Sequence, residues 1–278
     1  MRVATITKPF TVEIQEQDIP KVGPGDVLIK VKCCGICGSD LHLFKGTHAF
    51  RKLPAVLGHE VSGEVVKIGE NVGRIKLGDR VTVEPQVGCG ACYFCRNDMT
   101  NLCLNKKVPG TPTWLGTFAD YFLAPEQAVY KLSDFVSYDS GALVEPLAVA
   151  VHAMNRIDES KIADSKTIAV LGCGTIGLLV LAIAKQKGYG QLFGTDTAPF
   201  NRKLALDMGA NAAYDPLNES PSEEINTATG EKGVDVCIVA AGASNIIDQA
   251  SSLTKKGGQI ILVSMMTKPI PVYTYGLV

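Results

Sequence analysis

The chain has 278 residues, of which 46% are hydrophobic and 20% charged, a composition typical of a globular protein of about two domains. Its formal net charge of -1 argues against a nucleic-acid-binding protein. The N-terminus lacks an apolar signal core, and the longest apolar stretch, 176–184, is too short to span a bilayer. We therefore expect a cytoplasmic protein with neither a membrane nor a nucleic-acid partner.

Residues 1–150 are predicted to form a β-rich domain. Apolar and polar residues alternate along 27–33 and 61–66, as in half-buried strands, and 80–83 and 117–123 are further strand candidates. Gly63 lies inside one of these segments and predicts a bend or a close backbone approach. From about residue 139 to 155 the sequence becomes helical and leads into the second part of the chain.

One candidate set of metal ligands in this domain consists of Cys37, His59, Glu60 and Glu145. One sulfur, one imidazole and one or two carboxylates make a mixed ligand set that leaves room for water or a substrate oxygen, as in catalytic zinc sites. Spacing alone does not connect Cys37 with His59. Glu145 is also compatible with a carboxylate at a helix N-terminus, where the helix dipole stabilises negative charge.

Ser39 and His42 follow Cys37 closely and are candidates for passing a substrate proton towards solvent. The alternative is a serine in a turn and a histidine on the surface.

Four of the nine cysteines are clustered in a lobe at about 85–107, and they are Cys89, Cys92, Cys95 and Cys103. Four thiolates can close a tetrahedral shell with no open position, which favours a structural zinc. A disulfide pair and an iron–sulfur cluster are the alternatives, although the spacing is not that of ferredoxins. In a reducing compartment such a cluster indicates metal binding before disulfides.

Residues 151–278 alternate between strand and helix patterns. Strands are predicted at 167–171, 191–195, 211–214, 234–240 and 258–263, and helices at 175–187, 200–208, 221–228 and 244–254. This order predicts a parallel sheet covered on both faces, hence an α/β fold. Five strands are accounted for, whereas a dinucleotide-binding fold normally has six, so we expect the sheet to lack its last strand and the chain to be truncated.

A dinucleotide site is predicted where the first of these strands meets its helix. Gly172, Gly174 and Gly177 match the G-x-G-x-x-G spacing, which allows a tight turn, close approach to a pyrophosphate and close packing of helix on strand. Thr175 and Ile176 begin the helix, whose N-terminal amides and dipole favour the pyrophosphate.

An acidic residue follows at the end of the next strand. Asp196 lies nineteen residues after Gly177. A carboxylate there can accept hydrogen bonds from a ribose diol and repels a 2′-phosphate, so the sequence favours NAD over NADP.

A family resemblance rests on these motifs together. Residues 58–60 (Gly-His-Glu), followed by Gly63 and Gly69, resemble the zinc signature of the medium-chain zinc-dependent dehydrogenases. The four-cysteine lobe and the downstream nucleotide unit occur in the order that this family uses, and the resemblance covers the whole chain. It implies a GroES-like catalytic domain (1–150), a Rossmann NAD-binding domain (151–278) and two zinc ions per chain.

The same resemblance implies residue roles. Cys37 and His59 would be ligands of the catalytic zinc, with Glu60 a ligand or exchange partner. Glu145 lies in a stretch similar to the polyol branch (sorbitol and xylitol dehydrogenases), at or next to the metal. Family members commonly carry an arginine five residues after the acidic residue, whereas this chain has Asn201 there and Arg202, a candidate cofactor contact, next to it.

The implied function is an NAD-dependent zinc oxidoreductase that acts on a secondary alcohol of a polyol or vicinal diol. Ser39, His42, Glu60 and Glu145 are the candidate catalytic residues. A threonine- or butanediol-type dehydrogenase is the alternative, and so is a catalytically impaired fragment that binds zinc and NAD. The family forms homo-oligomers, which we do not expect of this short form.

Overall fold

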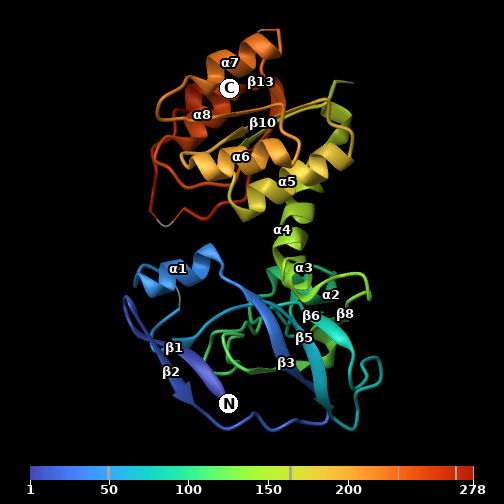
Figure 1. Ribbon diagram of the computed structural model, residues 1–278. Coiled ribbons are helices and arrows are strands. Elements are labelled where there is room, and N and C mark those ends of the chain that lie inside the picture. The colour runs from blue at the N-terminus through green and yellow to red at the C-terminus, as the bar shows by residue number, and fades with distance from the viewer. Residues whose placement is uncertain (49–50, 163–164, 231, 267, 278) are drawn as a thin grey trace. The chain divides into compact units, whose positions relative to one another are not determined.

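The computed structural model describes residues 1–48, 51–162, 165–230, 232–266 and 268–277 (Figure 1). The chain divides into two compact units, Met1–Glu145 and Pro146–Val278, where the sequence suggested a boundary near residue 150. No helix in these described ranges is long and apolar enough to cross a membrane.

The first unit contains two antiparallel sheets. The larger has the order β7-β3-β5-β6-β8 and the smaller has the order β2-β1-β4. Their strands are β1 (Arg2–Lys8), β2 (Thr11–Glu16), β3 (Asp26–Gly35), β4 (Ala55–Val56), β5 (Glu60–Ile68), β6 (Arg80–Val83), β7 (Tyr121–Pro125) and β8 (Val129–Lys131).

Strands β3 and β5 form the centre of the larger sheet, because the alternating apolar residues of both point into one core. Ile29 and Val65 are register partners and both are buried. Gly63 opposes Val31, and a Cβ atom at Gly63 would lie 2.4 Å from the carbonyl oxygen of Lys30. The predicted close approach at this glycine is therefore present, and it keeps the two strands in contact up to the ends that carry the site.

Helices α1 (Gly38–Phe44), α2 (Tyr93–Arg96) and α3 (Tyr138–Ala142) belong to the first unit, and α4 (Val144–Met154) begins there. The sequence suggested one helical stretch from 139 to 155, but the structure breaks it at Leu143. Pro146 accounts for the break, since it has no N–H for the carbonyl of Ala142 and its ring would clash with that carbonyl. In the first turn of α4 the missing N–H costs nothing.

The second unit is a five-stranded parallel sheet in the order β11-β10-β9-β12-β13. Its elements are β9 (Thr167–Leu171), α5 (Thr175–Gln186), β10 (Gln191–Thr195), α6 (Pro199–Asp207), β11 (Ala212–Tyr214), α7 (Pro221–Ala228), β12 (Val234–Val239), α8 (Ile246–Leu253) and β13 (Thr254–Leu262). The predicted α/β class, a β-rich domain followed by a parallel sheet, is confirmed.

The central strand β9 is buried on both faces, as its uninterrupted apolar sequence predicts. Ile168 and Val170 pack in a core with residues of α5, whereas Ala169 and Leu171 pack in a second core with residues of α7 and α8. The chain leaves β9 in one direction towards β10 and β11, and it later adds β12 on the other side of β9. This change of direction lies at the carboxyl end of β9, where open α/β sheets bind their ligands.

Candidate active site and nucleotide site

The mixed ligand set of the first unit is assembled where β3 and β5 meet. Gly35, at the end of β3, pairs with Glu60, at the start of β5. Cys37 lies two residues beyond β3 and is the N-cap of α1, while His59 directly precedes β5. The structure brings the ligand atoms of Cys37, His59 and Glu60 within 4.8 Å of one another. Sequence spacing did not show this proximity, because it depends on strand pairing.

The donors of this set are a buried carboxylate, that of Glu60, and two half-buried groups, the Cys37 thiol and the His59 imidazole. Glu60 is only 6% exposed, and burial raises the pKa of its carboxyl, although His59 acts in the opposite direction. Burial also raises the pKa of the Cys37 thiol, while hydrogen bonds from Ser39 lower it. Within the described residues, the buried Nδ1 atom of His59 has no hydrogen-bond partner. Sulfur, imidazole and carboxylate donors gathered within one small space fit a zinc ion, and zinc binding would favour their deprotonated forms.

Asp40 is a further candidate for this site, and the sequence reasoning missed it. Its carboxylate is 3% exposed and accepts hydrogen bonds from the backbone N–H of Cys37 (2.9 Å) and of Gly58 (3.3 Å). Its Oδ1 atom also lies 3.7 Å from Nδ1 of His59. Asp40 thus contacts the backbone at or beside two proposed ligands, as carboxylates behind zinc-binding histidines commonly do. Its place three residues after Cys37, in the first turn of α1, was the available signal.

Glu145 lies close to this set but outside it. It is the second residue of α4, and the compact set of ligand atoms does not include it. Burial raises the pKa of Glu145, and His59, Glu60 and Asp40 act on it electrostatically. Its carboxyl group is therefore within electrostatic range of the site, and direct binding of metal by Glu145 stays a prediction.

The two proposed relay residues lie on α1. Ser39 contacts the Cys37 sulfur through its backbone and its side chain. His42 lies one turn further on, on the same side of the helix, and its Nδ1 atom is 3.3 Å from the hydroxyl of Thr47. Proton transfer along these residues is not tested by the geometry.

The four cysteines of the lobe also come together. Their sulfur atoms all lie within 4.8 Å of one another, which suits tetrahedral coordination of one metal ion with metal–sulfur bonds of about 2.3 Å. The Cys103 sulfur accepts hydrogen bonds from the N–H groups of Cys89 (3.3 Å) and Asn105 (3.4 Å). The backbone N–H of Cys95 lowers the pKa of Cys92 to about 6. N–H groups directed at sulfur stabilise thiolates, the form that binds zinc.

In the second unit the glycine loop has the geometry that a pyrophosphate requires. Gly172 has a φ of 95°, and a Cβ atom at Gly177 would lie 1.9 Å from the carbonyl oxygen of Gly172. A Cβ atom at Gly174, the N-cap of α5, would meet nothing within 4 Å. Thr175 is exposed and Ile176 half-buried in the first turn, where backbone N–H groups lack partners within the helix. The space in front of Gly174 fits a bound phosphate group.

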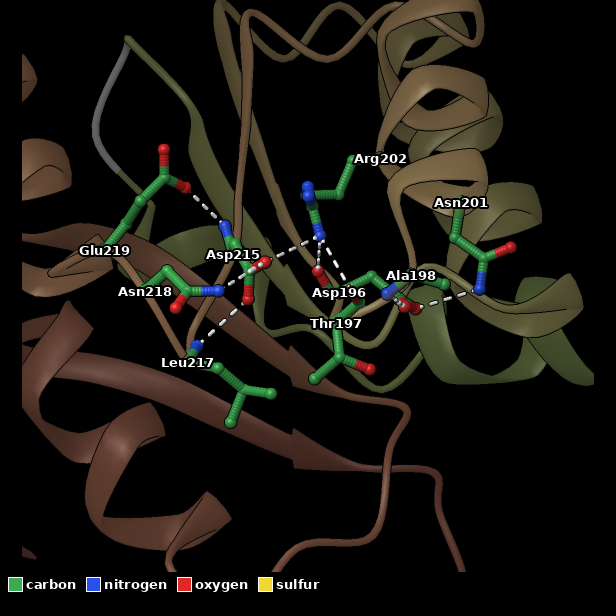
Figure 2. A network of polar contacts seen from close by, with 9 residues as sticks. All are labelled: Asp196, Thr197, Ala198, Asn201, Arg202, Asp215, Leu217, Asn218 and Glu219. Carbon is green, nitrogen blue, oxygen red and sulfur yellow. Dashed lines mark hydrogen bonds and ion pairs between the residues drawn. The ribbon is translucent and has the colours of Figure 1, made fainter.

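Asp196 follows β10 and is joined to this loop. One oxygen of its carboxylate accepts from the N–H of Cys173 (2.9 Å) and from the amide of Asn201 (3.1 Å). The other oxygen accepts from the N–H of Ala198 (2.8 Å). Arg202, predicted as a cofactor contact, is directed instead towards backbone carbonyls and Asp215 (Figure 2).

Comparisons with known proteins agree with these two units. Residues 23–134 match the family model described as the alcohol dehydrogenase GroES-like domain, and residues 175–278 match the zinc-binding dehydrogenase model. The chain is 36% identical to sorbitol dehydrogenase of Bacillus subtilis (strain 168) over 269 residues, which cover 95% of this chain and 75% of that protein. It is 40% identical to D-arabitol-phosphate dehydrogenase of Enterococcus avium over 249 residues, covering 89% and 70%.

Among solved structures, a protein from Sinorhizobium meliloti 1021 bound to NADP matches with a TM-score of 0.91 and 32% identity. The match covers 99% of this chain and 80% of that one. Both units of the chain thus match proteins of a single group. The chain belongs to the family of zinc-dependent medium-chain dehydrogenases, in its polyol branch.

Proposed function

We propose that this zinc-dependent oxidoreductase oxidises a secondary alcohol of a polyol or vicinal diol and passes the hydride to NAD. The observation that carries the proposal is the convergence of Cys37, His59 and Glu60 within 4.8 Å, in a unit that also holds a separate four-sulfur cluster. A mixed ligand set suits a catalytic ion, because it leaves a position for substrate, whereas a closed all-sulfur set suits a structural one.

The residues of the first unit have distinct tasks in this proposal. Cys37, His59 and Glu60 would hold the catalytic zinc, which as a Lewis acid lowers the pKa of a substrate hydroxyl, while the hydride chemistry belongs to the nicotinamide. Ser39 and Glu145 are placed to move or hold the proton that the alcohol loses. Burial raises the pKa of Glu145, a direction that favours its protonated form and suits a group that holds a proton.

The residues of the second unit hold and orient the cofactor. The loop at 172–177 accepts the pyrophosphate and Asp196 accepts the ribose diol, so the proposal favours the unphosphorylated dinucleotide. The S. meliloti structure is bound to NADP, which makes the cofactor choice a matter for direct measurement.

The test has two parts. Elemental analysis of protein purified without chelator should give two zinc ions per chain, and one or none would contradict the proposal. Absorbance of NADH should rise in a screen with polyols, and a response to threonine or butanediol alone would favour the alternative substrate class. His59→Ala should remove turnover with little loss of stability, whereas Cys95→Ser should chiefly lower the melting temperature, because it opens a closed shell.

A further inference from the structure

Two adjacent residues of α6 contact different groups, Asn201 the side chain of Asp196 and Arg202 its backbone carbonyl (Figure 2). Asn201 donates its amide N–H to the Asp196 carboxylate at 3.1 Å. Arg202 extends towards the loop after β11, where it meets Asp215. The uncharged Asn201 therefore contacts the carboxylate proposed to accept the ribose, whereas the positively charged Arg202 pairs with Asp215.

The guanidinium of Arg202 is occupied by the protein itself. Its Nη1 atom donates to the carbonyl oxygens of Asp196 (2.8 Å) and Thr197 (3.0 Å), and it lies 3.2 Å from Oδ2 of Asp215. The side chain of Arg202 is 20% exposed and that of Asp215 is 14% exposed. A pair so shielded from water is screened less than a surface ion pair.

Asp215 is held in place from its other side. Its Oδ1 atom accepts from the N–H of Leu217 (3.0 Å), and its Oδ2 atom accepts from the amide of Asn218 (3.2 Å). The N–H of Asp215 donates to the carboxylate of Glu219. These contacts make the loop after β11 a fixed support for Arg202, and through Arg202 they connect it with the segment 196–198.

The direction of the Asp196 carboxylate depends on that segment. Three N–H groups donate to the carboxylate, from Cys173, Ala198 and Asn201, and a carboxylate has about four acceptor positions. About one position therefore stays free for a ribose hydroxyl. A carboxylate held in one orientation both accepts that hydroxyl and repels a 2′-phosphate, whereas one that can turn away does neither well.

We propose that the Arg202–Asp215 pair is a clamp that positions Asp196, and that it sets the discrimination between 2′-hydroxyl and 2′-phosphate dinucleotides without touching the cofactor. The proposal rests on the proposed binding of dinucleotide by the second unit. Arg202 is then a positioning residue. The competing role, direct contact between Arg202 and a cofactor phosphate, gives the opposite result in the experiment below.

The experiment is a fluorescence titration of the whole chain with NADH and with NADPH. Arg202→Gln and Asp215→Asn should each weaken NADH binding by about tenfold and leave NADPH binding much less affected, so that the ratio of the two dissociation constants narrows. Arg202→Lys should restore most of the ratio, because it keeps the charge opposite Asp215. The control is Lys203→Gln, which removes a positive charge from an exposed position of α6 and should leave the ratio as in the parent.

Each result decides the matter. An unchanged ratio in both clamp variants overturns the proposal, and so does a ratio that widens in Arg202→Gln, because direct contact with the 2′-phosphate predicts a selective loss of NADPH. Melting temperatures identify misfolding, and Asp215→Asn, which keeps the side-chain volume, gives the answer where Arg202→Gln does not fold. If the unmutated protein binds neither dinucleotide, the proposed function and the clamp are both overturned. If the unmutated protein binds NADH and the clamp variants bind both dinucleotides as it does, the clamp alone is overturned.

Discussion

Replacement of Asp40 tests how the proposed catalytic ligands are held. Asp40→Ala removes the acceptor of two buried N–H groups, those of Cys37 and Gly58, and leaves Nδ1 of His59 without its neighbouring carboxylate. An unsatisfied buried donor costs about 1–3 kcal/mol, and the Gly58 contact is long at 3.3 Å, so we expect the free energy of unfolding to fall by about 2–4 kcal/mol. Loss of such a supporting carboxylate typically weakens metal binding by about 10–100-fold.

Asp40→Asn separates the two effects. It keeps the volume of the side chain and one acceptor oxygen, but it places an amide N–H against one of the backbone donors and removes the charge that faces His59. A chelator titration of the zinc-loaded variant should release one zinc ion at about 10–100-fold lower chelator concentration, while the second, held by the four cysteines, is unchanged.

The four-cysteine site is thus an internal control, and Asp18→Asn, an exposed change in the same unit, is the control for charge. If Asp40→Asn releases both ions at the parent's chelator concentrations, Asp40 only caps α1 and our account of the site is wrong.

Three further changes test the second unit. Gly177→Ala should weaken NADH binding by about tenfold or more, since its Cβ atom would lie 1.9 Å from a carbonyl oxygen. Gly25→Ala, where a Cβ atom would lie in open space, is the control. Equal NADH affinities of Gly177→Ala and the parent would contradict the reasoning. Asp196→Ala should weaken the binding of NADH and reduce the protein's preference for NADH over NADPH. Equal affinity of the parent protein for both dinucleotides would refute this idea. Thr167→Val should lower the free energy of unfolding by about 1–3 kcal/mol in urea, because Asp235, 2% exposed, loses two 2.8 Å hydrogen bonds with the Thr167 hydroxyl, one to its carboxylate and one from its backbone N–H. An unchanged midpoint would show that its other contacts suffice.

Local patterns were sufficient for the second unit. The strands of its sheet and the helices α5, α6, α7 and α8 lie close to the predicted positions. Parallel strands buried on both faces are uninterrupted apolar runs, and the helices between them repeat at 3.6 residues. The glycine loop and the four-cysteine lobe could also be read directly, since each is complete within a short segment. The largest difference is β13, which begins at Thr254 instead of 258. Its register with β12 shifts between Val234 and Val236. The pattern of apolar residues along a single strand does not predict such a shift, because the shift depends on the partner strand.

Tertiary structure decided the rest of the candidate sites. Cys37 and His59 are neighbours because β3 pairs with β5 through the partners Gly35 and Glu60, and strand pairing depends on contacts distant in sequence. Asp40 gained its role in the same way, since the backbone of Gly58 reaches it only after this pairing.

The direction of adjacent side chains was equally inaccessible from the sequence. The family resemblance suggested Arg202 as a cofactor contact, but it could not give the direction of the side chain, because successive residues of a helix point about 100° apart. Asn201 therefore meets Asp196, while Arg202 finds its carboxylate partner on the loop after β11. Composition and periodicity specify which elements form, whereas the partner of each polar side chain depends on how those elements pack.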